Sequence, residues 1–207
     1  QPPHRQINLE AVKVFLAQAG GKEKFTMGPF SGKGLSEPLR GLAVTSSSLL
    51  ASGFVSAEAG LSAQSWIING GDWADEPHLY SSVRHFYDPL SLSGSAWLTD
   101  QSEIHGHYDS PSIDARTWGL SHSDNPFSFF VALSAYKAAL EVRDDLPLPP
   151  ALSSLHFKTS LSLAPKDHED LRSLQLARAY RALGEAMHML GDMTQPAHVR
   201  NDSHPAD

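Results

Sequence analysis

Residues 167–193 constrain the fold of this chain more than any other segment, because their pattern predicts one long helix that ends in potential metal ligands. The apolar positions at helical spacing are expected to form a core stripe: Leu176, Tyr180, Leu183, Met187 and Leu190. His188 and Asp192 lie four residues apart, so both side chains leave the same face of the helix and can reach one ion. They lie off the apolar stripe, and Gly184 leaves space one turn below. We therefore expect a cleft at this end of the helix.

The motif continues beyond this helix as Gly-Asp-x-x-Gln-Pro-x-His, from Gly191 to His198. Pro196 breaks the helix, so His198 comes from a separately aimed segment and could serve a neighbouring ion. Neutral imidazole and carboxylate are ligands that suit zinc. His-x3-Asp alone is also compatible with a helix end whose His188 and Asp192 face solvent. The extended motif and the upstream partners favour a metal site instead.

Two upstream segments and one residue near the start contain further candidate ligands. Asp72 and Asp75 lie in the acidic turn Gly-Gly-Asp-Trp-Ala-Asp-Glu, His85 begins the run His-Phe-Tyr-Asp-Pro, and His4 lies near the start of the chain. Each has an ordinary explanation by itself: a solvated turn, a hydrogen-bonded histidine packed among aromatic residues, and a tail residue. Their order along the chain is what makes them informative together.

Helical spacing predicts further helices over residues 8–18, 37–50, 62–69 and 125–142. Gly70-Gly71 is expected to end the third of these, and Asn125-Pro126 to begin the fourth as its N-cap and first helical residue. Strand-like alternation is scarce. The sequence therefore predicts an all-α fold: a single compact multi-helix domain over residues 1–207, with a metal cluster in a cleft.

Composition removes several functional classes. The net charge of −7 argues against a surface that coats nucleic acid, which would be basic. The absence of cysteine excludes disulfides and thiolate metal sites. No apolar run approaches the roughly 18–20 residues that span a bilayer. No leader pattern is visible, so any signal peptide is expected to have been removed. No stable nucleic-acid or protein partner is inferred.

Taken together, these motifs resemble the superfamily of zinc-dependent phospholipases C and single-strand-specific nucleases. His-Phe-Tyr-Asp-Pro at 85–89 has the form seen in bacterial zinc phospholipases C, which are the closest type. Trp-Ala-Asp-Glu at 73–76 looks like the fungal nuclease version of the same ligand turn. The resemblance extends from His4 to the last residues. It implies an all-α enzyme with up to three zinc ions in a cleft.

The resemblance also implies a ligand set, residue by residue. One ion would be held by Asp75, His85, His188 and Asp192. Asp192 would bridge to a second ion, which His4 and the N-terminal amine and carbonyl of the chain would also bind. His198 would hold the third ion. Asp72 is an alternative to Asp75 whose flanking residues match the family less well.

The third position lacks the family's usual partners. The family continues into a helix with His-x3-Glu, whereas this sequence offers His204, with Asp202 or Asp207 as the carboxylate. We therefore expect this position to be empty, partly occupied, or completed by water or a neighbouring molecule. Glu76 and Ser82 stand where choline-selective phospholipases have a Tyr and a Phe, so selectivity for choline is not implied.

The implied function is hydrolysis of phosphoric diesters by a metal-activated water, with Asp75 and Asp192 as catalytic residues. The expected substrate is a phospholipid, reached by peripheral membrane contact, and the expected location is secreted or periplasmic. Two alternatives stay open: a single-strand-specific nuclease or nucleotidase of the same superfamily, and an inactive metal-binding helical domain. His105-Gly-His107 is interpreted as a surface loop, and His122 and His168 as solvated residues. Four aromatic residues could line the cleft or pack in the core: Trp73, Phe86, Tyr87 and Trp118.

Overall fold

The computed structural model describes residues 3–18, 38–45, 54–75, 84–90, 113–149, 152–156 and 159–199. Most of these residues are helical. The helices are α1 (Pro3–Gln18), α2 (Ala63–Trp73), α5 (Ala115–Ser121), α6 (Phe129–Leu140), α7 (His168–Asp192) and α8 (Pro196–Val199). None of the described helices is long and apolar enough to cross a lipid bilayer.

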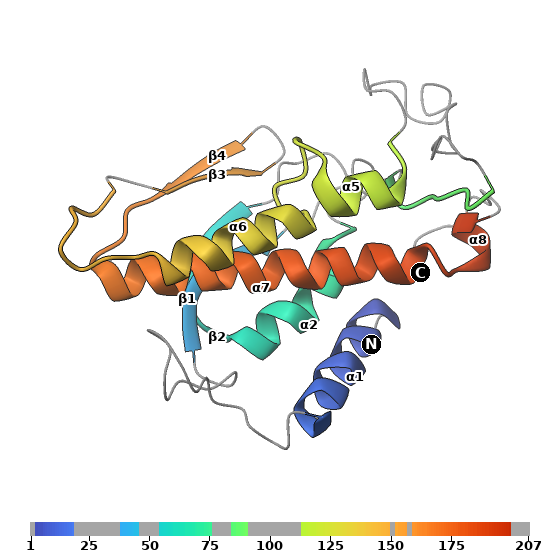
Figure 1. Ribbon diagram of the computed structural model, residues 1–207, viewed down its shortest axis with the longest axis horizontal. Helices are drawn as coiled ribbons and strands as arrows, with labels where there is room; N and C mark the ends of the chain where they lie inside the picture. The colour runs from blue at the N-terminus through green and yellow to red at the C-terminus, as the bar shows by residue number, and fades with distance from the viewer. Residues whose placement is uncertain are drawn as a thin grey trace.

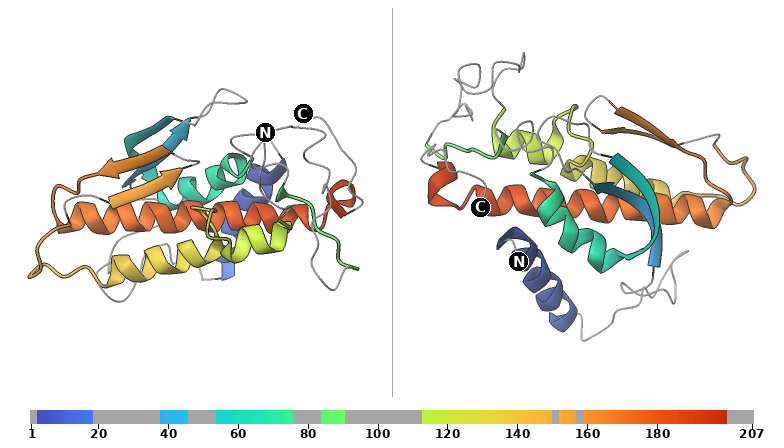
Figure 2. Two further views of the ribbon diagram at one scale, coloured as in Figure 1. Left: turned by 90° about the horizontal axis from the view of Figure 1, so that it is seen from above. Right: turned by 180° about the vertical axis from the view of Figure 1, so that it is seen from behind.

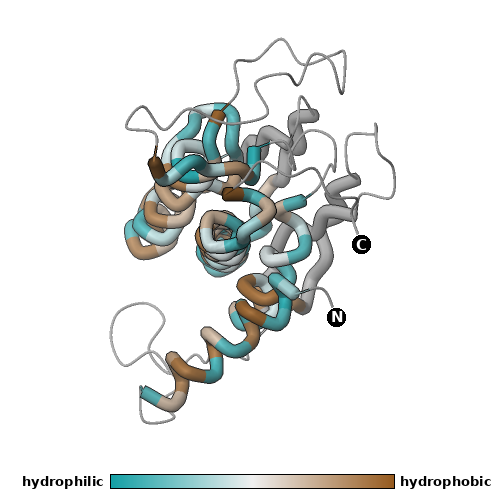
Figure 3. Tube along the Cα trace, turned by 90° about the vertical axis from the view of Figure 1, so that its right-hand side faces the viewer, coloured by the Kyte–Doolittle hydropathy of each residue, from teal (hydrophilic) through white to brown (hydrophobic). Residues whose placement is uncertain are grey.

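Helix α7 is the axis of the fold (Figure 1). Helices α5 and α6 pack on one side of it and α2 on another, an arrangement that the two further views in Figure 2 repeat. Helix α1 contacts α2 and α7 and is the outermost of the helices, as the view along α7 shows (Figure 3). The last turns of α7 therefore lie where α1, α2, α5 and α8 converge.

Two antiparallel hairpins accompany the helices. Strand β1 (Pro38–Thr45) pairs with β2 (Phe54–Ser62), and β3 (Leu152–His156) pairs with β4 (Thr159–Leu163). Both hairpins lie toward the N-terminal half of α7, away from α8 (Figure 1). The prediction of a helix over 37–50 is wrong, because that segment contains β1. The helices build the core, so the all-α prediction is confirmed, with the two hairpins added to it.

Helix α2 begins as its sequence predicts and ends later. The hydroxyl of Ser62 caps it by accepting a hydrogen bond from the Ser65 amide at 3.1 Å. The prediction that Gly70-Gly71 ends this helix is wrong, because α2 continues to Trp73. A Cβ on Gly70 would lie 2.8 Å from the Arg181 carbonyl oxygen of α7. The glycine therefore permits close helix packing, which offsets its poor helix propensity.

Helix α6 begins three residues later than predicted. Ser128 is its N-cap, and the predicted caps Asn125 and Pro126 lie in the turn before it. The Asn125 side chain instead accepts from the Phe127 amide at 2.9 Å and donates to the Trp118 carbonyl at 2.8 Å. Asn125 therefore ties this turn to α5, and the next residue able to cap begins the helix.

Helix α7 has the predicted extent. Asp167 caps it by accepting from the Asp170 amide at 2.7 Å, and the helix ends at Asp192, before Pro196. The predicted core stripe is only partly correct: Leu176 is buried, whereas Leu190 is 61% exposed. The buried face of α7 also includes four polar residues: Arg181, Glu185, His188 and Asp192.

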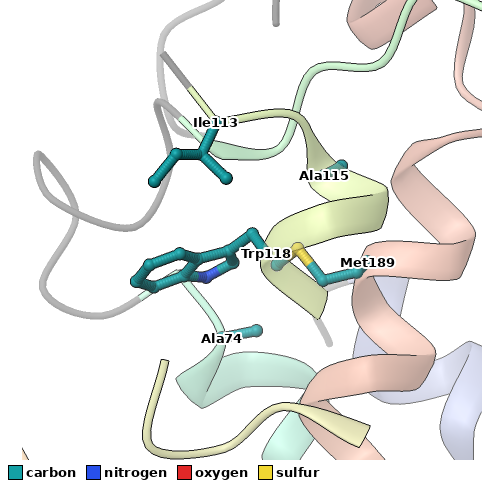
Figure 4. Close-up of a cluster of buried hydrophobic side chains, with 5 residues drawn as sticks. All are labelled: Ala74, Ile113, Ala115, Trp118 and Met189. Atoms are coloured by element: carbon teal, nitrogen blue, oxygen red, sulfur yellow. The ribbon is translucent and has the colours of Figure 1, made fainter. Parts of the chain in front are cut away.

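An apolar cluster fixes the end of α7 that carries these residues (Figure 4). Trp118 of α5 packs with Met189 of α7 and with Ala74, which follows α2. A Cβ on Gly119 would lie 2.8 Å from the Met189 side chain, so α5 approaches α7 closely here. The amide of Ala115 donates to the Phe86 carbonyl at 2.9 Å, which links α5 to the segment that carries His85.

Candidate metal centre

His188 lies buried at the candidate site, and a hydrogen bond holds its ring in place. Its side chain is 1% exposed, and its Nδ1 donates to the carbonyl oxygen of Gly71 at 2.7 Å. That hydrogen bond orients the ring and places the proton on Nδ1. When the ring is neutral, as metal binding requires, the lone pair of Nε2 is directed at the neighbouring carboxylate and imidazole groups.

Three ligand atoms from three parts of the chain converge at this nitrogen. Nε2 of His188 lies 3.1 Å from Nδ1 of His85, 3.0 Å from Oδ2 of Asp192 and 3.5 Å from Oδ1 of Asp75. Nδ1 of His85 lies 3.3 Å from the same oxygen of Asp75 and 2.6 Å from that of Asp192. Asp75, His85 and His188 together form one group able to hold a metal ion.

Two of these five distances, those to Asp75, have the size of a tetrahedral zinc site, and the other three are shorter. Zinc binds nitrogen and oxygen at about 2.0–2.2 Å, so the ligand atoms of a regular tetrahedron lie about 3.3–3.6 Å apart. The five separations run from 2.6 to 3.5 Å. Two imidazole nitrogens and two carboxylate oxygens are also a donor set that zinc accepts. The residues present therefore fit a zinc ion.

Asp192 directs its other oxygen to a second group. Its Oδ1 lies 3.1 Å from Nε2 of His4 and 3.6 Å from Nε2 of His198. The His4 ring stacks on the His188 ring, with centroids 3.8 Å apart and planes 26° apart. His4, His188 and Asp192 form a second group able to hold a metal ion. Asp192 belongs to this second group, and its Oδ2 lies 2.6 Å from His85 and 3.0 Å from His188 of the first.

The carboxylate of Asp192 is deeply buried among imidazole rings. Nitrogens of His4, His85 and His188 approach its two oxygens within 3.1 Å. Burial would raise the pKa of this carboxyl, but the imidazoles of His85, His188 and His4 outweigh burial and hold its pKa far below the usual range. Asp192 is therefore a carboxylate at every ordinary pH, as a metal ligand must be.

No protein-family model matches this chain. No curated protein and no solved structure matches it either.

Five segments supply the six predicted ligands. Helix α1 carries His4, the turn after α2 carries Asp75, and the segment 84–90 carries His85. Helix α7 supplies His188 and Asp192, and α8 supplies His198. Nδ1 of His198 donates to the His85 carbonyl at 3.1 Å, and its ring lies 5.0 Å from that of Phe86. The structure thus brings all six predicted residues together, and the assignment of His198 to a separate third ion stays a prediction.

Exposure identifies the open side of the site. The side chains of His85, His188 and Asp192 are each 1% exposed, whereas that of Asp75 is 38% exposed. Asp75 therefore lies where solvent reaches the site. Asp72, the alternative ligand, lies 3.9 Å from Nη1 of Arg5 and belongs to neither group of described ligands. Burial raises the pKa of Asp72, and Arg5 partly opposes that shift.

One buried ion pair beside the site was not predicted. Nε of Arg181 donates to Oε1 of Glu185 at 2.7 Å, one turn before His188. The Arg181 guanidinium lies 3.7 Å from the centroid of the Phe127 ring and 5.0 Å from that of Trp73. Burial raises the pKa of Glu185 to about 6, against the opposing effect of Arg181. The sequence carried only a weak signal, an Arg-x3-Glu pair that usually marks a solvated helix face.

The remaining predicted residues divide between core and surface. Phe86 and Trp118 are buried in the core, not lining an open cleft. His122 packs against the Trp118 ring at 5.4 Å, and Nε2 of His168 contacts the Leu146 carbonyl at 2.8 Å, so neither is simply solvated. Several predicted residues lie outside the described residues: Glu76, Ser82, His105, His107, Asp202, His204 and Asp207.

Proposed function

We propose that this protein is a zinc-dependent hydrolase of phosphoric diesters that resembles phospholipase C. The observation that carries the proposal is the position of Asp192. One of its oxygens faces His85 at 2.6 Å and His188 at 3.0 Å, while the other faces His4 at 3.1 Å. A carboxylate shared in this way would hold two ions, which together would supply the positive charge that stabilises a phosphodiester during displacement.

The proposed ligand set follows from these contacts. One zinc ion would be held by Asp75, His85, His188 and Asp192, and a second by Asp192 and His4. Bound zinc would supply positive charge for the phosphoryl oxygens and would lower the pKa of a coordinated water to about 7. The protein keeps the two positions adjacent through the buried Asp192 carboxylate. It fixes the His188 ring through the hydrogen bond to Gly71.

Asp75 is proposed to move a proton as well as bind metal. Its carboxylate is the most exposed member of the first group, at 38%, and Oδ1 lies 3.3 Å from Nδ1 of His85. A second carboxylate oxygen on the open side can accept a proton from an attacking water. The three other ligands are too buried for that task, so Asp75 is assigned as general base.

A phospholipid is the proposed substrate, reached from a membrane surface. Three large apolar side chains of α1 are exposed: Ile7 at 43%, Val14 at 55% and Phe15 at 58%. The hydropathy of α1 alternates along its length (Figure 3). Ile7 and His4 both lie over Gly191, so part of this apolar surface adjoins the second metal position. Peripheral contact of α1 with lipid would present the site to a head group, and we propose a secreted or periplasmic location for it.

The two alternative functions differ in what they require. A single-strand-specific nuclease needs aromatic side chains on which bases can stack. Phe86, Trp66 and Trp118 are buried and cannot stack on bases, and the exposed Phe15 lies on α1 with the aliphatic side chains of Ile7 and Val14, a composition that favours lipid over nucleic acid. An inactive metal-binding domain would have the same ligands and no turnover.

One set of assays separates these three functions. The zinc-loaded protein should hydrolyse a short-chain phospholipid in solution and release little nucleotide from single-stranded DNA. His188→Ala should abolish hydrolysis and bound zinc, whereas the matched variant His168→Ala should keep both. Nucleotide release without lipid hydrolysis would favour the nuclease. Full zinc content with neither activity would favour the inactive domain, and a wild-type protein without zinc would refute all three.

A further inference from the structure

The three helices that surround the metal centre meet at one buried side chain, Asn8 of α1. Asn8 is 0% exposed. Its Nδ2 donates to the carbonyl oxygen of Ile67 in α2 at 2.8 Å and to that of Gly184 in α7 at 3.1 Å. A single amide group therefore links α1, α2 and α7.

Glycine makes this junction possible. A Cβ on Gly71 would lie 2.8 Å from Nδ2 of Asn8 and 3.0 Å from the His4 carbonyl oxygen. A Cβ on Gly184 would collide with the Ile67 carbonyl. The backbones of the three helices thus approach one another directly, and Asn8 fills the space between them.

Each partner of Asn8 lies one helical turn from a residue of the metal centre. Asn8 itself follows His4 by one turn, and Gly184 precedes His188 by one turn. Ile67 precedes Gly71 by one turn, and the Gly71 carbonyl accepts the Nδ1 proton of His188. The contacts of Asn8 therefore connect His4 to the two elements that orient His188.

The amide of Asn8 donates to both helix carbonyls at the junction. Both carbonyls lie within helices, and each oxygen has a second lone pair that can accept one of the two Nδ2 protons. Desolvation of the amide oxygen is unfavourable, because Oδ1 of Asn8 is buried without a hydrogen-bond partner among the described residues. A buried polar atom left unpaired is unusual in a core and is expected where a residue serves a function as well as packing.

We propose that Asn8 is a positioning residue for the second metal position, where it holds His4 against Asp192. The proposal rests on the proposed two-ion site. His4 is the second residue of α1, and the ends of helices fray. Its contact with Oδ1 of Asp192, at 3.1 Å, therefore depends on an anchor further along the helix. Asn8 is that anchor, one turn away.

The test compares Asn8→Ala with Val12→Ala. Val12 is the next buried residue of α1, at 6% exposure, and its truncation weakens the docking of α1 without removing a hydrogen bond. Zinc affinities are measured by competition titration in the full chain. Loss of a residue that orients a ligand typically lowers metal affinity by about tenfold or more. Asn8→Ala should show that loss for the more weakly bound ion and leave the tighter ion unchanged.

The control and a double variant decide between positioning and plain destabilisation. Val12→Ala should keep both affinities even if it lowers the melting temperature further than Asn8→Ala. In a His4→Ala background, Asn8→Ala should cause no further loss of zinc affinity, because both changes remove the same contact. Unchanged zinc affinity in Asn8→Ala, or an equal loss in Val12→Ala, would overturn the role of Asn8. Selective zinc loss in a protein without diester hydrolysis would instead overturn the proposed function.

Discussion

Zinc affinity should rise steeply with pH above neutrality, because His188 must lose a proton to bind metal. Burial lowers the pKa of His188, but the Asp192 and Asp75 carboxylates outweigh burial and raise it to about 9 in the metal-free protein. Metal ligation needs the neutral ring. At pH 7 deprotonation would oppose zinc binding by about 2.7 kcal/mol, since one pKa unit corresponds to about 1.4 kcal/mol. Zinc affinity should therefore increase about tenfold for each pH unit between 7 and 9, and then level off.

Two measurements test this behaviour. Competition titrations with a chelator at pH 7, 8 and 9, corrected for the chelator's own protonation, give the slope of affinity against pH. Calorimetry in buffers of different ionisation enthalpy gives the protons released, and His188 should release about one at pH 7. His168→Ala should leave the slope unchanged. A flat affinity between pH 7 and 9, with no proton release, would show that His188 is already neutral and that the carboxylates do not act on it as described.

Three further predictions concern the shared carboxylate, the helix junction and the metal-free protein. Asp192→Asn should lower kcat/KM for a phosphodiester more than His198→Ala, because the amide donates a hydrogen bond where a ligand must accept; equal losses would contradict a shared carboxylate. Gly184→Ala should lower the free energy of unfolding in urea by about 1–3 kcal/mol, because the added Cβ would collide with the Ile67 carbonyl. Gly191→Ala is the control: its Cβ would lie 3.4 Å from the nearest atom, so this variant should have little effect. In the metal-free protein, the free energy of unfolding should fall as pH rises from about 6.5 through 9. Protonated His188 stabilises the fold, and this stabilisation is complete only below the pKa that His188 has in the unfolded chain, about 6.5, and is lost as pH passes the folded pKa of about 9. Thermal melts across that range, compared with His188→Ala, would measure the loss.

The parts of the fold that local sequence determines were predictable. The cap at Asp167, the long periodic segment and the stop before Pro196 define α7 without reference to any other element. The spacing of His188 and Asp192 places both on one face whatever packs against it. The remaining ligands required a resemblance to known motifs, because their contacts join segments far apart in the sequence.

The errors arise where a distant partner overrides a local preference. Segment 38–45 is a strand because β2 pairs with it, and its own pattern does not contain that information. Gly70 stays helical because α7 approaches it closely, which no local propensity predicts. Asn8 is a polar residue at the start of the predicted helix over 8–18, and nothing in the local sequence distinguishes it. Its importance depends on Ile67 and Gly184, which become its neighbours only in the folded chain.

Anomalous scattering at the zinc edge, from crystals of the zinc-loaded protein, tests the shared-carboxylate site most directly. We expect two strong peaks on opposite sides of Asp192. One should lie about 2.0–2.2 Å from ligand atoms of Asp75, His85, His188 and Asp192, and the other at the same distance from His4 and the second Asp192 oxygen. A weaker third peak is expected beside His198. A single peak, or two peaks of which neither shares Asp192, would contradict the account.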